Sequence, residues 1–103
     1  LDSVQFVNTY VKFVQKIRLQ YPKTKIICAA GPSGLGDKWL KFQSHVLAVT
    51  DHFKNIDKDV YYFNFSPFDP HGSDWHPNLE EHKKMADELI FFIKKIRWIK
   101  YTS

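Results

Sequence analysis

The chain has 103 residues, of which 44% are hydrophobic, 17% aromatic and 25% charged. A chain of this length forms one domain at most, with a modest core, because folding at this size buries only about 60% or slightly more of the surface that the unfolded chain exposes. No stretch approaches the roughly 18 consecutive apolar residues of a membrane span, so we expect no membrane partner.

The charge is mildly basic, with 15 Lys and Arg against 11 Asp and Glu and a net charge of +4. Most of the Lys and Arg residues fall on the polar faces and at the carboxyl ends of expected helices, where a basic side chain suits the helix dipole. No recognisable nucleic-acid module accompanies them, so we expect solvated faces and no nucleic-acid partner. The single cysteine, Cys28, excludes an internal disulfide and reads as a small buried hydrophobe.

The first half of the chain predicts a helix, a strand and a loop. Valines recur at three- and four-residue spacing over residues 3–20, which is typical of a helix with one apolar face, until "YPK" ends the pattern. The run "KIICAA" at 25–30 is short, apolar and bounded by breakers, as expected of a strand. The segment "GPSGLGD" at 31–37 is the part richest in glycine and is a loop. Because the chain begins at Leu1 without a signal-like stretch, we expect a processed product or an excised piece.

The second half predicts a helix, a strand and the longest helix. An apolar stripe ending in Val46, Val49 and Phe53 indicates a helix over residues 38–53. The aromatic and β-branched run "VYYFNF" at 60–65 is typical of a strand. After the loop "SPFDPHGSDWHP", one helical face is expected to carry Leu79, His82, Ala86, Leu89, Ile93 and Ile96.

The order α, β, α, β, α with short connections favours an α/β fold with parallel strands, right-handed crossovers and helices on the faces of the sheet. Two strands are few for a parallel sheet, which normally has more neighbours and two covered faces. The sequence therefore predicts that residues 1–103 are part of a larger α/β domain.

The stretch "DPHGSDWH" at 69–76 holds two histidines and two aspartates directly after the last expected strand. In open parallel sheets, ligands bind beyond the carboxyl ends of the strands. In an extended segment, Asp74 and His76 point to the same side, so the carboxylate could accept a hydrogen bond from one imidazole nitrogen and leave the other nitrogen as a base. On chemistry alone, Asp74 and His76 make half of a catalytic triad.

Two other interpretations of this stretch stay open. His76 and Asn78 flank an expected helix start, with Pro77 at an early helical position, so the segment could serve only to begin the helix. A metal site would use His71, Asp74 and His76 as two nitrogen ligands and one oxygen ligand, but their spacing matches no strong metal motif. We therefore expect no metal.

The remaining polar residues favour structural roles. Ser33 lies in a loop that lacks both the Lys-Ser/Thr ending of a phosphate loop and a glycine–x–serine–x–glycine pattern. Ser66 and Ser73 are typical turn residues. His82 falls on the expected apolar face of the last helix, so we expect it to be packed and hydrogen-bonded.

The block "GSDWHPN" followed by "EEHKKMADELIFFI" resembles the carboxyl-terminal part of the SGNH or GDSL-type hydrolases, and most closely the acetyl esterases of carbohydrate esterase family two. The upstream segment "FVNTYVKFVQKIRLQYPKTKIICAAGP" is also similar to this family, so the resemblance covers nearly the whole chain. It implies a flavodoxin-like three-layer α/β/α fold and a secreted enzyme without a metal or other cofactor. Its expected substrate is an acetylated plant polysaccharide such as xylan or glucomannan.

The resemblance also implies residue roles. His76 matches the family's catalytic base, Asp74 matches the residue that orients it, and Trp75 matches an aromatic residue of the block that we expect to contact substrate. Ser73 stands where relatives often have cysteine. The nucleophilic serine and the oxyanion-hole residues of the family lie upstream and have no counterpart in this chain, so residues 1–103 would be the carboxyl-terminal segment of one SGNH-like domain.

Two hypotheses follow. In the first, the chain is part of a serine esterase, inactive by itself, and depends on the amino-terminal part of the same domain in the same or another chain. In the second, it is a non-catalytic α/β module that binds carbohydrate or protein through exposed aromatic side chains around Phe65, Phe68 and Trp75.

Overall fold

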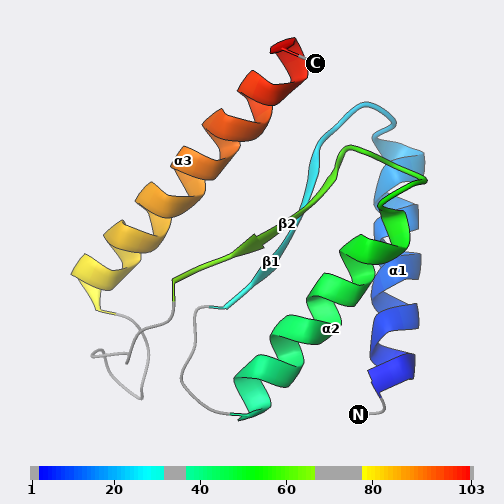
Figure 1. Ribbon diagram of the computed structural model, residues 1–103, viewed down its shortest axis with the longest axis horizontal. Coiled ribbons are helices and arrows are strands. Elements are labelled where there is room, and N and C mark those ends of the chain that lie inside the picture. The colour runs from blue at the N-terminus through cyan, green and yellow to red at the C-terminus, as the bar shows by residue number, and fades with distance from the viewer. Residues whose placement is uncertain (1–2, 32–36, 67–77, 103) are drawn as a thin grey trace.

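The structure is a computed structural model that describes residues 3–31, 37–66 and 78–102. Its elements follow the expected order: α1 (Ser3–Gln20), β1 (Ile26–Ala30), α2 (Asp37–Phe53), β2 (Val60–Asn64) and α3 (Leu79–Thr102) (Figure 1). The strands and the second helix agree with the sequence prediction to within one residue at each end. The alternation of strand and helix signals was therefore sufficient to place the elements.

The two strands pair in parallel, with Ile26 opposite Val60 and Ala30 opposite Asn64. Helices α1 and α2 lie on one side of the strands and α3 lies on the other (Figure 1). This arrangement confirms the predicted α/β architecture with parallel strands and gives three layers. The carboxyl ends of both strands reach the same edge of the sheet, where the chain leaves toward α2 and α3 (Figure 1).

The main core lies between the sheet and the α1–α2 layer. Alternate residues of β1 face this layer, and Cys28 and Ala30 are almost fully buried there. They meet Val14 of α1 and the stripe of α2 that the sequence predicted. The buried members of this cluster are Val11, Val14, Ile26, Cys28, Ala30, Val46, Val49 and Phe53.

The opposite face of the sheet is covered by α3 through a small aromatic cluster. The Phe92 ring lies 4.8 Å from the Phe63 ring and 6.4 Å from the Tyr61 ring, measured between centroids. Phe63 also packs edge-on against Phe65, at 4.7 Å. Phe65 is 9% exposed, so the expectation of an exposed aromatic at this position was wrong, because Phe65 continues the strand alternation onto the α3 face and stacks there.

The inner face of α3 agrees with the predicted one only in part: Ile96 is buried and Leu89 is half-buried, whereas the other four predicted residues are exposed. Leu79 is 88% exposed and His82 is also exposed, so the expected packed role of His82 was wrong. The side chains turned inward include Phe92, and among them Ile96 is buried. The run "LIFFI" at 89–93 puts apolar residues all around the helix, so periodicity could not choose a face, and the tertiary contact of Phe92 with the strand aromatics chose it.

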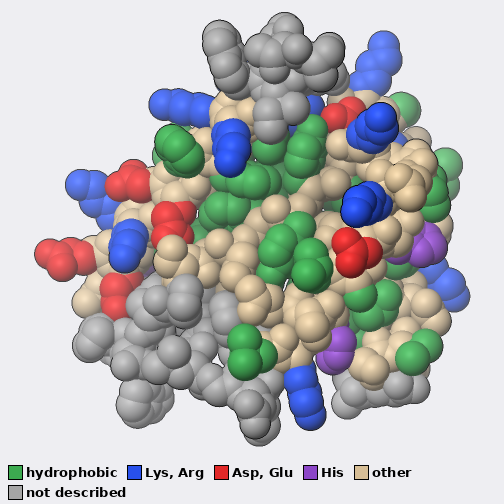
Figure 2. Space-filling model, in the orientation of Figure 1, with side chains coloured by type: hydrophobic (Ala, Val, Ile, Leu, Met, Phe, Trp, Pro, Cys, Tyr) green, Lys and Arg blue, Asp and Glu red, His purple; other side chains and the backbone are tan. Residues whose placement is uncertain are grey.

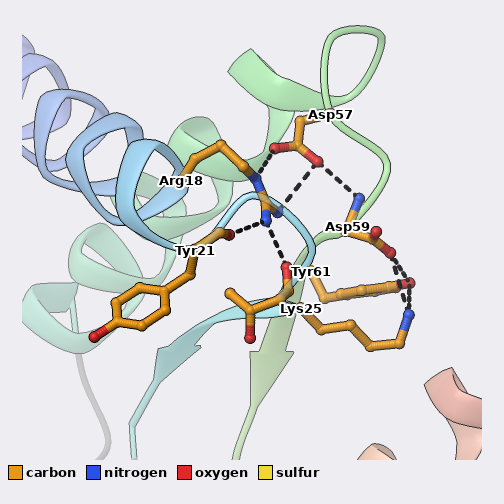
Figure 3. Close-up of polar contacts among 7 residues, drawn as sticks. Arg18, Tyr21, Lys25, Asp57, Asp59 and Tyr61 are labelled. Atoms are coloured by element: carbon orange, nitrogen blue, oxygen red, sulfur yellow. Dashed lines mark hydrogen bonds and ion pairs between the residues drawn. The ribbon is translucent and has the colours of Figure 1, made fainter.

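The amino end of the sheet is tied together by a polar network centred on Arg18 (Figure 3). The guanidinium donates from Nε to Asp57 Oδ2 at 2.7 Å, and from Nη1 to the carbonyl oxygens of Tyr21 and Thr24 at 2.9 and 2.6 Å. Asp57 Oδ1 accepts a hydrogen bond from the backbone N–H of Asp59 at 3.0 Å. The network therefore fixes the turn before β1 and the turn before β2 to each other.

A second ion pair continues this network. Lys25 Nζ lies 3.1 Å from Asp59 Oδ1 and 5.4 Å from the centre of the Tyr61 ring (Figure 3). Burial lowers the pKa of Lys25, but its hydrogen bonds to Asp59 and Tyr61 more than offset this, so the pKa is raised overall.

Among the described residues, no helix combines the length and apolar character that crossing a membrane requires.

Candidate functional site

The candidate site lies at the carboxyl ends of the two strands. Phe65 donates its backbone N–H to the carbonyl of Ala30 at 3.1 Å, which extends the pairing one residue beyond β2. On β1, the next residue is Gly31 with φ of 91°, a left-handed conformation that glycine adopts without steric cost. Both strands therefore release the chain at this edge, as in other α/β sheets where ligands bind beyond the strand ends.

Helix α3 holds the described residues on both sides of the 67–77 segment. The carboxylate Oε2 of Glu88 accepts the backbone N–H of Ser66 at 3.1 Å, just after β2. At the other end, Asn78 and Glu81 form a reciprocal capping box: the Glu81 carboxylate accepts the Asn78 N–H at 2.8 Å, and Asn78 Oδ1 accepts the Glu81 N–H at 2.9 Å. One helix therefore fixes where the segment begins and where it ends.

The capping box also settles the helix start. Asn78 is the N-cap residue and α3 begins at Leu79. The sequence suggested an earlier helix start, with Pro77 at an early helical position, so that start was placed too early. The pattern Asn-x-x-Glu at 78–81 is a known start signal and could have identified both partners from the sequence. Glu88 lies seven residues after Glu81, on the same face of α3, but nothing in the sequence indicated its contact with Ser66.

The predicted catalytic residues Asp74 and His76 lie outside the described residues, as do Trp75, His71 and Ser73. Ser33 lies outside them too. The pairing of Asp74 with His76 therefore stays a prediction. The structure places the two residues that flank 67–77: Ser66 at the carboxyl end of β2 and Asn78 at the start of α3.

A cavity of about 260 Å³ opens beside this edge, between the end of β2 and α3. Its polar lining includes Glu88 and Lys95 of α3 and Asn64 at the end of β2, and its apolar lining includes Phe91, which is 72% exposed. The Oδ1 atom of Asn64 is buried and has no hydrogen-bond partner among the described residues. The lining therefore includes a carboxylate, an ammonium group and an exposed aromatic ring, which are groups that can contact a polar ligand.

Away from this edge, positive and negative side chains are mixed over the surface in view. Figure 2 shows Lys and Arg side chains spread over the viewed face and interleaved with Asp and Glu. Lys12, Lys16, Lys83 and Lys94 are exposed on the helices, as expected of solvated helix faces. Within residues 3–31, 37–66 and 78–102, no group of three or more His, Cys, Asp or Glu side chains could hold a metal ion. The metal hypothesis concerned His71, Asp74 and His76, so it is untested.

Fold and site together define an α/β protein whose candidate site lies at the carboxyl edge of a parallel sheet. Comparison with known proteins gives the family. The chain is 33% identical over 102 residues to the cellulase/esterase CelE of Acetivibrio thermocellus, covering 94% of this chain and 12% of CelE. It is 27% identical to an acetylxylan esterase/glucomannan deacetylase of Cellvibrio japonicus, covering 92% of this chain and 26% of that protein.

The structural comparison agrees. The fold matches a family two carbohydrate esterase from Clostridium thermocellum, solved in complex with cellohexaose, with a TM-score of 0.87 and 32% identity; the match covers 95% of this chain and 32% of that one. No family model matches the chain. The homologues and structural neighbours of this chain are thus family two carbohydrate esterases, and the predicted resemblance to that family is confirmed.

The chain spans a third or less of the length of the relatives that it matches. The prediction that these residues form part of a larger esterase domain agrees with this coverage. The roles of individual residues and secretion stay predictions.

Proposed function

We propose that residues 1–103 form the carboxyl-terminal part of a secreted, SGNH-type serine esterase that removes acetyl groups from plant polysaccharides such as xylan or glucomannan. The observation that carries the proposal is the position of Ser66 and Asn78, the described residues on either side of 67–77, which are both bonded to α3, Ser66 at the carboxyl end of β2. The relatives support the substrate, since one is an acetylxylan esterase/glucomannan deacetylase.

In this proposal, the nucleophilic serine and the oxyanion-hole donors come from the rest of the domain. His76 takes the serine proton as the oxygen attacks the acetyl carbonyl, and it then gives that proton to the departing sugar oxygen. The acetyl-enzyme is hydrolysed when His76 takes a proton from water and returns it to the serine, releasing acetate. Asp74 accepts a hydrogen bond from the second imidazole nitrogen and stabilises the imidazolium, and Trp75 contacts the sugar.

The same reasoning makes residues 1–103 inactive without the rest of the domain. Acyl transfer gains most of its rate from an activated nucleophile and from preorganised donors to the oxyanion, and a base alone supplies neither. The partners of the chain are then the acetylated polysaccharide and the amino-terminal part of the domain. No cofactor enters the reaction.

The test is His76→Ala in the complete protein, assayed by acetate release from an aryl acetate and from acetylated glucomannan. We expect kcat to fall by about a thousandfold or more, with the thermal midpoint unchanged. The matched control is His82→Ala, because His82 is an exposed histidine six residues further along the chain. Turnover by His76→Ala close to that of the control would refute the assignment. Loss of activity to a chelator and its recovery with a divalent ion would instead favour the metal hypothesis.

The alternative is the non-catalytic binding module. Burial of Phe65 removes one of its three aromatic residues, while Phe68 and Trp75 lie outside the described residues. Titration of the complete protein with acetylated and deacetylated glucomannan separates the two hypotheses. Binding of both glucans without any acetate release would favour the module.

A further inference from the structure

Part of the lining of the cavity beside the end of β2 is a row of side chains on α3. Glu88, Phe91 and Lys95 are spaced three and four residues apart, which places them on one face of the helix. The Phe91 ring is 72% exposed, although the ring of the next residue, Phe92, packs on the strand aromatics. Among the described residues, the ring that covers the strands is therefore that of Phe92, and the Phe91 ring is accessible at the cavity.

The cavity adjoins the candidate site. Ser66 also lines it, and the Glu88 carboxylate at the cavity accepts the Ser66 N–H at 3.1 Å. Ser66 directly precedes residues 67–77, to which the proposed function assigns the base His76. A ligand in the cavity therefore lies against the residue from which that segment starts.

The charges at the cavity favour a ligand without net charge. Lys95 is exposed and forms no ion pair with another residue in the described part of the chain, so its ammonium group is available as a hydrogen-bond donor. An anion would be repelled by the Glu88 carboxylate, and a cation would be repelled by the Lys95 ammonium group. A neutral ligand with hydroxyl or carbonyl oxygens meets neither repulsion and can accept a hydrogen bond from Lys95.

An exposed aromatic ring beside an ammonium group suits a sugar unit. A pyranose ring presents C–H groups on its face, which pack on the apolar face of an aromatic ring, and hydroxyl oxygens around its rim, which accept hydrogen bonds. The cavity of about 260 Å³ is slightly smaller than the range of about 300 to 1,000 Å³ that is usual for sites enclosing a whole small molecule. Its size therefore suits one unit of a longer ligand.

We propose that Phe91 and Lys95 form a subsite for one sugar unit of the polysaccharide main chain, separate from the unit that carries the reacting acetyl group. The inference rests on the proposed function, which supplies the polysaccharide, and it adds a second sugar contact on α3. The Phe91 ring packs on the face of this unit, and the Lys95 ammonium group donates a hydrogen bond to one of its oxygens. These two residues then determine the preference of the enzyme for a polymer over a small ester.

The test compares two substrates of the complete protein: acetylated glucomannan, which reaches the subsite, and an aryl acetate, which is too small to do so. The measured quantity is the ratio of kcat/KM for the glucomannan to kcat/KM for the aryl acetate. We expect Phe91→Ala to lower this ratio about fivefold to tenfold, through a higher KM for the polymer, because the contact is the same in the ground state and the transition state. Lys95→Ala should lower it about threefold.

Matched controls separate the subsite from general effects on the helix. Lys94→Ala removes an exposed lysine of α3 that is not part of the cavity lining, and Phe13→Ala removes a ring that is 60% exposed on α1, on the other side of the sheet (Figure 1). Both should keep the ratio of the unmodified protein. Phe91→Tyr keeps the ring and should restore the ratio, whereas Phe91→Leu keeps only apolar volume and should not.

An unchanged ratio in Phe91→Ala would overturn the inference, and so would full recovery by Phe91→Leu. An equal loss of kcat/KM on both substrates, with a lower thermal midpoint, would also overturn it, because that result would show that another part of the domain covers Phe91.

Binding of deacetylated glucomannan, measured by calorimetry, tests the subsite without the reaction. If the unmodified protein releases no acetate but Phe91→Ala weakens this binding about fivefold to tenfold, the proposed function alone is refuted. If the protein is an active esterase and Phe91→Ala binds glucomannan as tightly as the unmodified protein does, the inference alone is refuted. A protein that neither releases acetate nor binds glucomannan would refute both.

Discussion

The two ends of the parallel sheet are built differently. At the amino end, Arg18 and Lys25 each meet a carboxylate, and their bonds join the turns before the two strands (Figure 3). At the carboxyl end, a cavity opens beside α3, and its lining includes Glu88, Lys95 and the exposed ring of Phe91. A closed network stabilises a fold, whereas exposed charged and aromatic groups are accessible to a ligand. The comparison predicts that substitutions at the amino end change stability and that substitutions at the carboxyl end change activity.

The largest stability effect is expected for Arg18→Ala in the complete protein. Its guanidinium holds a carboxylate and two backbone carbonyls, and the Arg18 side chain is only 21% exposed. Removing it breaks the ion pair with the half-buried Asp57 carboxylate and the bonds to both carbonyl oxygens, so the free energy of unfolding should fall by about 2 kcal/mol. Urea unfolding measures this, and kcat at a temperature well below the midpoint should stay unchanged.

Arg97→Ala is the matched control, because Arg97 is exposed on α3. An Arg18→Ala protein as stable as this control, or one with full stability and reduced kcat, would contradict the division between the two ends. Arg18→Lys should recover only part of the loss, since an ammonium cannot reproduce the planar fork of donors.

The second effect concerns the start of α3. Asn78→Ala removes the side-chain oxygen that accepts the Glu81 N–H at 2.9 Å, and the loss of an N-cap costs about 1 kcal/mol. We expect this loss in urea unfolding, together with a lower kcat, because the cap ends the segment that carries His76. Asn78→Asp should restore both quantities.

Asn55→Ala provides the control, since Asn55 is exposed in the turn after α2. Stability reduced by Asn78→Ala with kcat unchanged would show that the cap stabilises the helix without positioning the segment. The capping interpretation of 76–78 would then hold without the catalytic one.

How much of this molecule the sequence could predict depends on how local each signal is. The helix over residues 3–20 was predicted with its observed bounds, and the strand at 26–30 was predicted one residue too long, at 25–30. The inner face of α3 was predicted only in part, through Leu89 and Ile96. Because "LIFFI" is apolar on all sides of the helix, only the contact with Phe63 shows that Phe92 also faces inward. The Glu88–Ser66 contact joins residues 22 apart and the Arg18–Asp57 contact joins residues 39 apart. No local pattern encodes such contacts. The Asp74–His76 pair is a local pattern whose geometry is untested.

A smaller effect is expected at Glu88. Its carboxylate accepts the Ser66 N–H where the chain leaves β2, so Glu88→Ala should let this end of the segment shift. We expect kcat to fall by about threefold to tenfold with KM little changed, because the loss affects the orientation of the base rather than substrate contacts. Glu88→Gln keeps an acceptor oxygen and should recover most of the activity. Initial-rate kinetics on an aryl acetate measure both variants.

Glu80→Ala is the control, because Glu80 is exposed in the first turn of the same helix. If Glu88→Ala and Glu80→Ala have the same kcat, the contact has no positioning role. If Glu88→Gln is as impaired as Glu88→Ala, the negative charge matters and the hydrogen bond alone does not explain the effect.

The smallest effect is expected in the pH dependence of stability, at the buried contact between Tyr10 of α1 and Cys28 of β1. Burial and the nearby Cys28 thiol, which also hydrogen-bonds to it, raise the pKa of Tyr10 to about 12, from an ordinary value near 10.0. The unfolded state therefore loses this proton before the folded state does, and the folded state binds more protons between pH 10 and 12. Since the slope of unfolding free energy against pH follows the protons bound in the unfolded state minus those bound in the folded state, stability falls as pH rises through this window.

Burial also raises the pKa of Cys28, and the Lys25 ammonium loses its ion pair when it deprotonates, so both groups add to the alkaline loss with the same sign. Tyr10→Phe should make the loss between pH 10 and 12 shallower without removing it. Urea midpoints at several pH values measure the slope, and Tyr21→Phe, at a tyrosine that is 58% exposed, is the control. Identical slopes in the two variants would show that the Tyr10 hydroxyl is hydrated in the folded protein and would contradict its buried contact with Cys28.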